Sequence, residues 1–168
     1  DILVNNAGVP GEREGIESVD EAHFQRVFDI HVKGTFFTTQ AVVPGMKAKG
    51  EGKIVNVSSM WAMTGHHFSS TYCGAKAAIL GLTKAWAKEF APHKICVNVI
   101  APGGVITEMV MRKGGMDYVR EQAKAVPLGR YAEAEEVSYT VAFLASPESD
   151  FITGQTVAIN GGQAIVGI

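Results

Sequence analysis

Ile2-Leu3-Val4-Asn5-Asn6-Ala7-Gly8 is a short apolar run that ends in a polar turn closed by glycine. This pattern is typical of a buried strand, and it predicts one over residues 2–6. Similar runs follow at residues 53–58, 95–100 and 155–159. Longer helical patterns separate the four runs, so the sequence predicts an α/β fold with a parallel sheet.

Four segments outside the predicted strands have helical patterns: residues 20–46, 70–90, 107–126 and 133–145. Asp20 can cap the first of them, and the Pro-Gly pair at 44–45 marks where that helix kinks or ends. The second is rich in small residues, which suits close packing against a helix or a sheet. The third is expected to be partly helical, as in a loop that closes over a site. No repeat or linker interrupts the sequence, so residues 1–168 are expected to form one domain.

The composition narrows the possible functions. The net charge is −2 and the basic residues are scattered, so we expect no binding of nucleic acid or of an anionic membrane. No apolar run has the length of a membrane-spanning helix, and no basic-then-apolar leader opens the sequence. Cys73 and Cys96 have neither the number nor the spacing of a disulfide framework or a metal site. A protein of the reducing cytoplasm, without a metal, is therefore expected.

Tyr72 and Lys76 stand four residues apart in the predicted helix 70–90, so both side chains leave one face of it, one turn apart. A tyrosine loses its proton near pH ~10, which is too high for a general base at neutral pH. A nearby ammonium stabilises the phenolate and is expected to lower the pKa of Tyr72. The pair alone is also typical of an exposed tyrosine that packs on a lysine stem, so its surroundings must decide.

Ser59 favours the catalytic interpretation of that pair. It directly follows the predicted strand 53–58, on the N-terminal side of Tyr72. The carboxyl ends of parallel strands meet at one edge of the sheet, and ligands of open α/β sheets bind outside that edge. The turns after the other strands are expected at the same edge, so the sequence predicts one site there.

Five motifs follow one another along the chain: Asn-Asn-Ala-Gly at residues 5–8, Ser59, Tyr-Cys-Gly-Ala-Lys at 72–76, Pro-Gly-Gly-Val-Ile-Thr at 102–107 and Ile-Thr-Gly-Gln at 152–155. In order and spacing they resemble the short-chain dehydrogenase/reductase family, over essentially the whole chain. The sequence is similar to 3-oxoacyl-carrier-protein reductases and to sugar or polyol dehydrogenases alike. The resemblance implies a Rossmann-like, doubly wound parallel sheet that lacks the family's first βαβαβ half.

The resemblance also implies an oxidoreductase that transfers a hydride between the nicotinamide of NAD or NADP and a small alcohol or carbonyl substrate. Tyr72 would exchange a proton with the substrate oxygen, and Ser59 would hydrogen-bond the same oxygen. Lys76 would lower the pKa of Tyr72 and bind the nicotinamide ribose. The implied cofactor contacts come from Asn6, Ala7, Gly8, Tyr72, Lys76, Val105 and Thr107. As alternatives, Asn6 only shapes a turn and Thr107 only caps the next helix.

Two features depart from the family pattern. His31 stands where the family usually has an asparagine that kinks the helix and holds a water linking the lysine to solvent. We expect His31 either to replace it in a proton relay and add a pH dependence, or to be satisfied by a backbone carbonyl. In addition, no glycine-rich phosphate-binding string occurs near the start. The sequence is therefore expected to be a fragment of a longer protein, or a truncated product that survives through association.

The segments on either side of the predicted helix 70–90 border the expected site. Trp61, Met63 and the His-His pair at 66–67 are expected to line the substrate pocket or to be loop residues without a role there. The Met-Val-Met run at 109–111 is expected to form the apolar face of a lid over the substrate.

Three functions remain open from the sequence. The first is the NAD(P)-dependent oxidoreductase, and the second is a non-catalytic scaffold or pseudoenzyme that serves only for oligomerisation. The third is an epimerase or dehydratase of the wider family, against which the closing motifs and the short chain after the site argue. The resemblance further implies a homo-oligomer, usually a tetramer, in which the helices at 20–46 and 70–90 pack against their counterparts.

Overall fold

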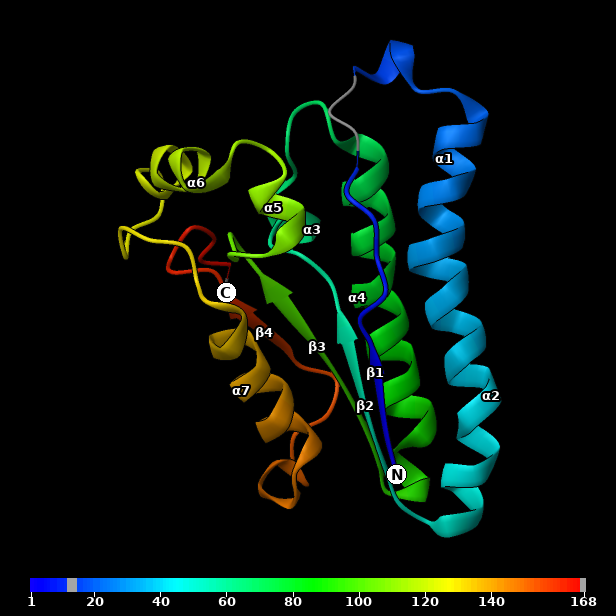
Figure 1. Cartoon of the computed structure of the whole chain (residues 1–168). Helices are drawn as coiled ribbons and strands as arrows, with labels where there is room; N and C mark the ends of the chain where they lie inside the picture. Colours follow the sequence, from blue (N-terminus) through cyan, green and yellow to red (C-terminus); the bar gives the residue numbers. More distant parts are fainter. Residues whose placement is uncertain (12–14, 167–168) are drawn as a thin grey trace.

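The computed structural model describes residues 1–11 and 15–166, in which four strands form one parallel sheet (Figure 1). The strands lie in the order β1-β2-β3-β4, with these bounds: β1 (Ile2–Asn5), β2 (Gly52–Val57), β3 (Ile95–Pro102) and β4 (Thr156–Ile159). Each predicted strand is present, with ends that move by at most two residues.

Helices and single helical turns connect the strands. Along the described chain they are η1 (Ile16–Ser18), α1 (Glu21–Phe28), the π-helical turn η2 (Asp29–Lys33), α2 (Gly34–Lys49), α3 (Trp61–Thr64), α4 (Ser70–Phe90), η3 (Ala91–His93), α5 (Glu108–Met111), α6 (Gly115–Ala123), α7 (Ala134–Ala145) and η4 (Pro147–Ser149). The helix predicted over residues 70–90 is confirmed residue for residue. The segment 107–126 is partly helical, as expected.

The first long helical segment begins as predicted but ends later. Asp20 caps α1, and its side chain accepts a hydrogen bond from the backbone N–H of His23 at 2.7 Å. The segment continues through η2 and α2 to Lys49, so of the two alternatives expected at the Pro-Gly pair, a kink or an end, the end is wrong. A proline inside a helix removes one N–H bond, but the buried packing of α2 against the sheet keeps these turns helical. A glycine with a left-handed φ of 74° then ends α2.

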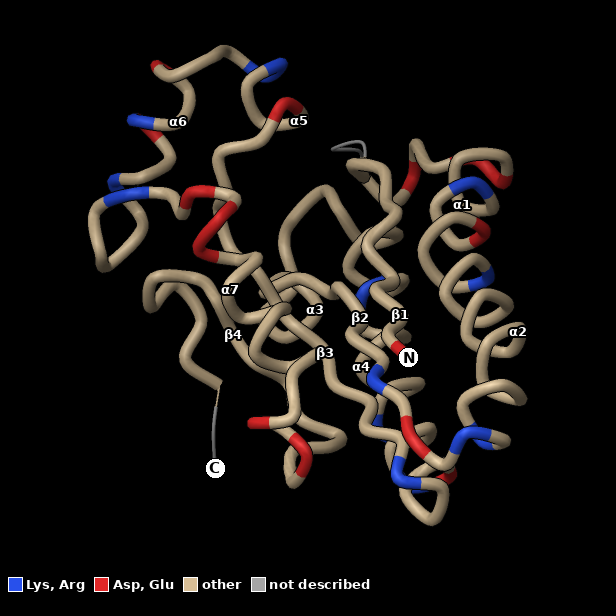
Figure 2. Tube along the Cα trace, turned by 60° about the horizontal axis from the view of Figure 1, so that its bottom comes forward, with Lys and Arg blue, Asp and Glu red and all other residues tan. Residues whose placement is uncertain are grey.

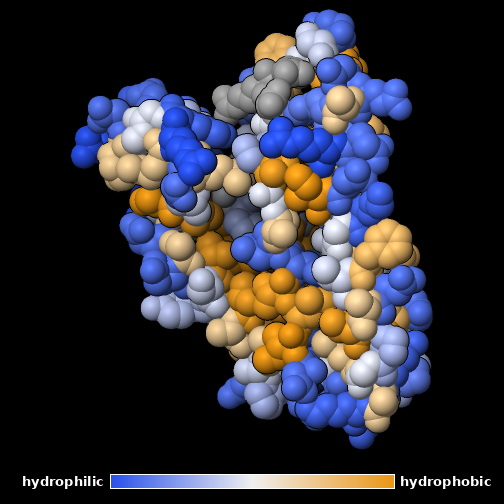
Figure 3. All heavy atoms as spheres, turned by 45° about the vertical axis from the view of Figure 1, so that its right-hand side comes forward, coloured by the Kyte–Doolittle hydropathy of each residue, from blue (hydrophilic) through white to orange (hydrophobic). Residues whose placement is uncertain are grey.

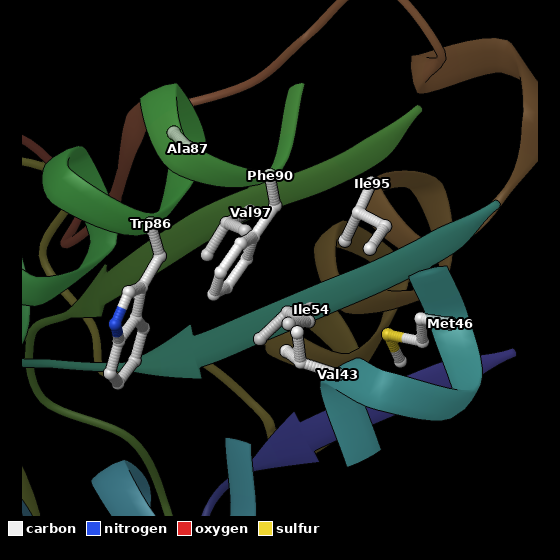
Figure 4. Packing of buried hydrophobic residues seen from close by; sticks show 8 residues of the cluster. All are labelled: Val43, Met46, Ile54, Trp86, Ala87, Phe90, Ile95 and Val97. Carbon is white, nitrogen blue, oxygen red and sulfur yellow. The ribbon is translucent and has the colours of Figure 1, made fainter. Parts of the chain in front are cut away.

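Helices cover both faces of the sheet: α2 and α4 lie on one face and α7 lies on the other (Figure 1). Successive residues of β2 serve the two faces in turn, because side chains alternate along a strand. Ile54 packs with Val43 and Trp86 on the α2–α4 side, as Figure 4 shows, and Val55 packs with Leu144 of α7. Burial of each such side chain contributes about 1.5–3 kcal/mol. This two-sided burial confirms the predicted doubly wound α/β architecture.

Polar side chains, some of them buried, join β1 and β2 to α2 and α4. The amide of Asn5 donates to Asn56 Oδ1 at 2.8 Å, and the amide of Asn56 donates to Thr83 Oγ1 at 2.9 Å. The hydroxyl of Thr38 donates to Asn5 Oδ1 at 2.7 Å. Asn56 and Thr83 are fully buried, and unpaired groups there would each cost about 1–3 kcal/mol. The chain of bonds therefore fixes the mutual positions of β1, β2, α2 and α4.

The surface carries charges of both signs and several exposed apolar side chains. Acidic and basic residues are scattered over the molecule rather than forming one charged face (Figure 2). Figure 3 shows hydrophobic side chains gathered into a broad area in the lower half of one face. Ile2 and Val4 of β1, at the edge of the described sheet, are 57% and 40% exposed. Among the helices of residues 1–11 and 15–166, none is long and apolar enough to cross a membrane.

Replacing Ile54 by alanine should lower the free energy of unfolding by about 2–5 kcal/mol, because the side chain is 1% exposed and its removal leaves a cavity between β2 and the helices. Urea unfolding followed by circular dichroism measures this loss. The matched control is Ile16→Ala, the same substitution at a side chain that is 75% exposed, which should change stability by less than about 0.5 kcal/mol. Equal losses in the two variants would contradict the assignment of this core.

Candidate active site

The turns after the strands converge on one cavity of about 410 Å³, which residues of α5 and α6 also line. Its walls include Ser59, Tyr72, Val105 and Thr107, which come from the segments after β2 and β3 and from α4. The predicted convergence at the carboxyl edge of the sheet is therefore confirmed. Such an edge is where ligands bind in open α/β sheets.

Lys76 lies one helical turn after Tyr72 on α4, and its ammonium is nearly enclosed. The residue is 5% exposed, and its Nζ donates a hydrogen bond to the backbone carbonyl of Val57 at 2.9 Å. Nζ lies 5.8 Å from the centre of the Tyr72 ring. Burial disfavours the charged form and lowers the pKa of Lys76 to about 8. The spacing of four residues thus places both groups on one face, as the sequence predicts.

Ser59 completes the group at the end of β2. Its residue is 8% exposed, and its hydroxyl oxygen accepts a hydrogen bond from the backbone N–H of Trp61 at 3.2 Å. Burial raises the pKa of Tyr72, the hydrogen bond from Ser59 opposes this rise, and the neighbouring Cys73 adds to it. The expected net fall in the pKa of Tyr72 is wrong for this arrangement. The reason is that burial of the phenol outweighs the other influences, while the ammonium bonds to Val57 instead.

His31 lies in the π-helical turn η2 and is 2% exposed. Its Nε2 lies 2.9 Å from the carbonyl oxygen of Val9, and its ring meets that of Tyr72 edge-on at 5.4 Å between centres. Burial, and then the charge of Lys76, lower the pKa of His31 to about 4, while the Val9 carbonyl opposes this. The expected bond to a backbone carbonyl is confirmed, and the expected titration near neutral pH is wrong.

The turn after β1 is open to solvent and shaped by close packing. Asn6, Ala7 and Gly8 are exposed, and the backbone N–H of Asn6 donates to the carbonyl of Val4 at 3.1 Å. A Cβ atom on Gly8 would lie 2.7 Å from Cε1 of His31, so only glycine fits here without a shift. The backbone of Asn6 thus takes part in the turn, and none of these three residues is among those that line the cavity.

The segment after β3 contributes Val105 and Thr107. Val105 forms a parallel bridge with Ala132, and Val105 and Thr107 line the cavity. Thr107 caps α5, and its hydroxyl oxygen accepts a weak hydrogen bond from the N–H of Val110 at 3.4 Å. The alternative interpretation of Thr107 as a helix cap is thus confirmed, alongside its place in the cavity wall.

Aromatic side chains form one wall of the cavity. Trp61 stacks on His66 at 4.0 Å between ring centres and meets Tyr72 edge-on at 6.0 Å. Of the expected pocket residues, Trp61 and His66 line the cavity, and Met63 and His67 do not; His67 stacks on His66 at 4.4 Å. Met109 and Val110 of the expected lid also line it, and Met111 does not.

Sequence reasoning missed Tyr131, whose ring forms another part of the wall. A Cβ atom on Gly104 would overlap this ring, so the glycine permits the close approach of the two segments. The signal was present, because a glycine just after a strand often marks such an approach. Its partner, far along the chain, could not be read from the sequence.

Comparison with known proteins agrees with this geometry. A family model described as enoyl-(acyl carrier protein) reductase matches residues 1–164. The 3-oxoacyl-[acyl-carrier-protein] reductase of Thermotoga maritima is 41% identical over 166 residues, which are 98% of this chain and 66% of that protein. The trans-4-hydroxycyclohexanecarboxylate dehydrogenase of Sinomonas cyclohexanicum is 40% identical over 97% of this chain and 60% of that protein.

A solved structure of a short chain dehydrogenase/reductase family protein superposes with a TM-score of 0.90 and 39% identity. It covers 98% of this chain and 68% of the other. The chain thus spans about two thirds of the length of the relatives that it matches. Because the family model, the sequence relatives and the solved structure agree over nearly all its residues, this chain belongs to the short-chain dehydrogenase/reductase family.

Proposed function

We propose that this chain provides the catalytic part of an NAD(P)-dependent oxidoreductase that interconverts an alcohol and a carbonyl compound. The observation that carries the proposal is that Ser59 and Tyr72, from two separate elements, line one cavity, and that the buried ammonium of Lys76 lies 5.8 Å from the centre of the Tyr72 ring. A protein that served only as a scaffold would have no need to bury an ammonium beside a phenol, since burial of a charge costs several kcal/mol.

The residues around the cavity fit a nicotinamide cofactor, NAD or NADP. The ammonium of Lys76 has three donors, and its bond to Val57 leaves others for the hydroxyls of a ribose. Asn6, Ala7 and Gly8 would contact the cofactor from the exposed turn after β1, and Val105 and Thr107 from the segment after β3. When bound, the nicotinamide would donate or accept the hydride.

The protein's own groups would handle the proton. In the reduction of a carbonyl, the Tyr72 phenol would donate its proton to the substrate oxygen, which Ser59 would hold by a second hydrogen bond. Because burial raises its pKa, Tyr72 stays protonated at neutral pH and is ready to act as this acid. Lys76 would stabilise the negative charge that develops on the phenol oxygen as the proton leaves.

His31 would act beside Tyr72 as a neutral imidazole. With a pKa of about 4 it is neutral at pH 7, and a neutral imidazole can donate from one nitrogen while it accepts at the other. Nε2 faces Val9, and the buried Nδ1 has no hydrogen-bond partner among the residues that the structure describes. We keep the proton relay as the proposed role of His31, together with support of the turn that precedes Val9.

The substrate would be a small molecule or an acyl group that enters between the aromatic wall and α5. Two relatives give tests: one is named for 3-oxoacyl groups on acyl carrier protein, and the other for a hydroxylated ring that bears a carboxylate. A short 3-oxoacyl thioester and 4-oxocyclohexanecarboxylate are suitable probes for these two classes.

The free thiols of Cys73 and Cys96 suit action in a reducing cytoplasm.

A homo-oligomer is the proposed assembly, built on the α2–α4 side. Phe36 and Phe37 are 38% and 53% exposed and border a groove of about 620 Å³ between η2, α2 and α4. Ala78 and Gly81 of α4 line this groove with very small side chains, so a helix from a second copy can approach closely. An apolar surface of this kind is typical of a protein interface.

Replacing Tyr72 by phenylalanine should lower kcat by about 10²–10⁴-fold, because the acid that protonates the substrate is lost. Binding of NADH or NADPH, followed by fluorescence titration, should change by no more than a few-fold. The rates are measured with both ketone probes on the protein that carries residues 1–168. Tyr139→Phe is the matched control, since Tyr139 is 71% exposed on α7 and should leave kcat unchanged. Full activity of Tyr72→Phe would refute the proposed function.

The rate of carbonyl reduction should be constant near neutral pH and fall as the pH rises through about 8, where Lys76 loses its proton. The fall follows from the sign of the shift: burial lowers the pKa of this cation, so its charge is present below about 8 and lost above it. A profile of kcat against pH checks this. Residual activity of Lys76→Arg should lack this limb, because arginine stays charged; a limb at the same pH in both proteins would assign it elsewhere.

Replacing Phe37 by aspartate should weaken self-association about tenfold or more, because a charge would enter the apolar groove. Light scattering coupled to size-exclusion chromatography, over a dilution series, gives the assembly mass. Ile16→Asp serves as the control, since it adds the same charge at an exposed site away from the groove. An unchanged assembly in Phe37→Asp would move the interface to another face.

A further inference from the structure

Ser58, the residue just before Ser59, has a hydroxyl that is not explained by the chemistry proposed above. The residue is 3% exposed, and its Oγ donates a hydrogen bond to the backbone carbonyl of Lys76 at 2.7 Å. Its own backbone N–H donates to the carbonyl of Ile100 at 2.8 Å, so Ser58 is held against β3 as well. A serine that only filled space here would not need a partner on the catalytic helix.

The bond from Ser58 is one half of a reciprocal pair. Lys76 Nζ donates to the carbonyl of Val57 at 2.9 Å, while the Ser58 hydroxyl donates to the carbonyl of Lys76. A side chain from each element therefore bonds to the backbone of the other. Two bonds of opposite direction at adjacent residues fix both the distance and the rotation between the end of β2 and this turn of α4.

These two hydrogen bonds between the end of β2 and the Lys76 turn are important because of the way α4 packs on the sheet. α4 packs mainly on β3, and it has far fewer neighbours on β2, the strand whose end carries Ser59. The apolar cluster between α4 and the sheet includes Ile54 near the start of β2 but no residue at the end of that strand, so it does not by itself fix Tyr72 and Lys76 relative to Ser59. Polar contacts at the end of β2 must set the geometry between them, and a misplacement of about 1 Å can cost 10²-fold in rate.

We propose that Ser58 is a positioning residue, whose hydroxyl holds the Lys76 turn of α4 against the end of β2 and thereby aligns Ser59 with Tyr72 and Lys76. The inference rests on the proposed oxidoreductase function. Ser58 itself touches neither substrate nor cofactor in this scheme. It acts through the Lys76 backbone.

Ser58→Ala tests the proposal in the protein that carries residues 1–168, with NADPH or NADH and the two ketone probes. We expect kcat to fall about 10- to 100-fold with little change in KM for the cofactor. We also expect the alkaline limb of the pH profile to move to higher pH, because water reaches Lys76 and relieves the effect of burial. Ser58→Thr, which keeps the hydroxyl, should recover most of the rate and the original limb.

Ser149→Ala is the matched control. Ser149 is also fully buried, and its hydroxyl donates to the backbone carbonyl of Leu144 at 2.9 Å, at the opposite end of the sheet. Thermal unfolding of both variants measures the loss of stability common to any buried serine. If Ser58→Ala and Ser149→Ala show equal kcat values and the same pH limb, Ser58 has only a structural role and the proposal is overturned.

Tyr72→Phe separates this failure from a failure of the proposed function. If Tyr72→Phe is inactive while Ser58→Ala behaves like Ser149→Ala, only the positioning role is lost. If Tyr72→Phe keeps full activity, the oxidoreductase mechanism and the inference fail together. If Ser58→Ala unfolds below the assay temperature, the rate and pH limb of Ser58→Thr decide, since a kcat and limb different from those of the parent protein would overturn the proposal.

Discussion

The burial of the Lys76 ammonium at the end of β2 is the constraint on which the rest of the site depends. A charged group that is 5% exposed is tolerated only when hydrogen bonds replace its water, and the Val57 carbonyl supplies one of them. That bond requires the turn of α4 that carries Lys76 to lie directly over the end of the strand. Because Tyr72 is one turn earlier and Ser59 two residues after Val57, the same requirement brings Ser59 and Tyr72 to the wall of one cavity, next to the buried Lys76.

The strand β2 prepares this arrangement along its own length. Ile54, Asn56 and Ser58 lie on one face of it, because side chains alternate along a strand. Ile54 packs in the apolar cluster under α2 and α4, Asn56 bonds to Thr83 of α4, and Ser58 bonds to the Lys76 carbonyl. The contact with α4 thus changes from apolar at the lower end of the strand to polar at the upper end. Directional hydrogen bonds replace packing where the alignment of reactive groups is decided.

Much of this could be predicted from the sequence, because it depends on local rules. The alternation of apolar runs and helical patterns predicted the four strands, and the spacing of four predicted that Tyr72 and Lys76 share a face. What failed depends on contacts between distant segments. The helix passes through Pro44 because packing on the sheet outweighs the proline, and the pKa of Tyr72 rises because its surroundings exclude water. The sequence predicted that His31 bonds to a backbone carbonyl, but it could not identify Val9 as the partner.

The two pKa shifts at the site explain why Ser59 matters beyond holding the substrate. Burial favours the neutral form of each group, so it raises the pKa of Tyr72 and lowers that of Lys76 to about 8. Both shifts oppose a phenolate beside an ammonium, which is the charge-separated pair that proton transfer from Tyr72 creates. The hydrogen bond from Ser59 is the influence at Tyr72 that favours the phenolate. Proton donation therefore depends on the hydrogen bond from Ser59 to the phenol and on the partners that keep Lys76 charged. In a site open to water, water would take over both roles, and neither Ser59 nor those partners would be needed for them.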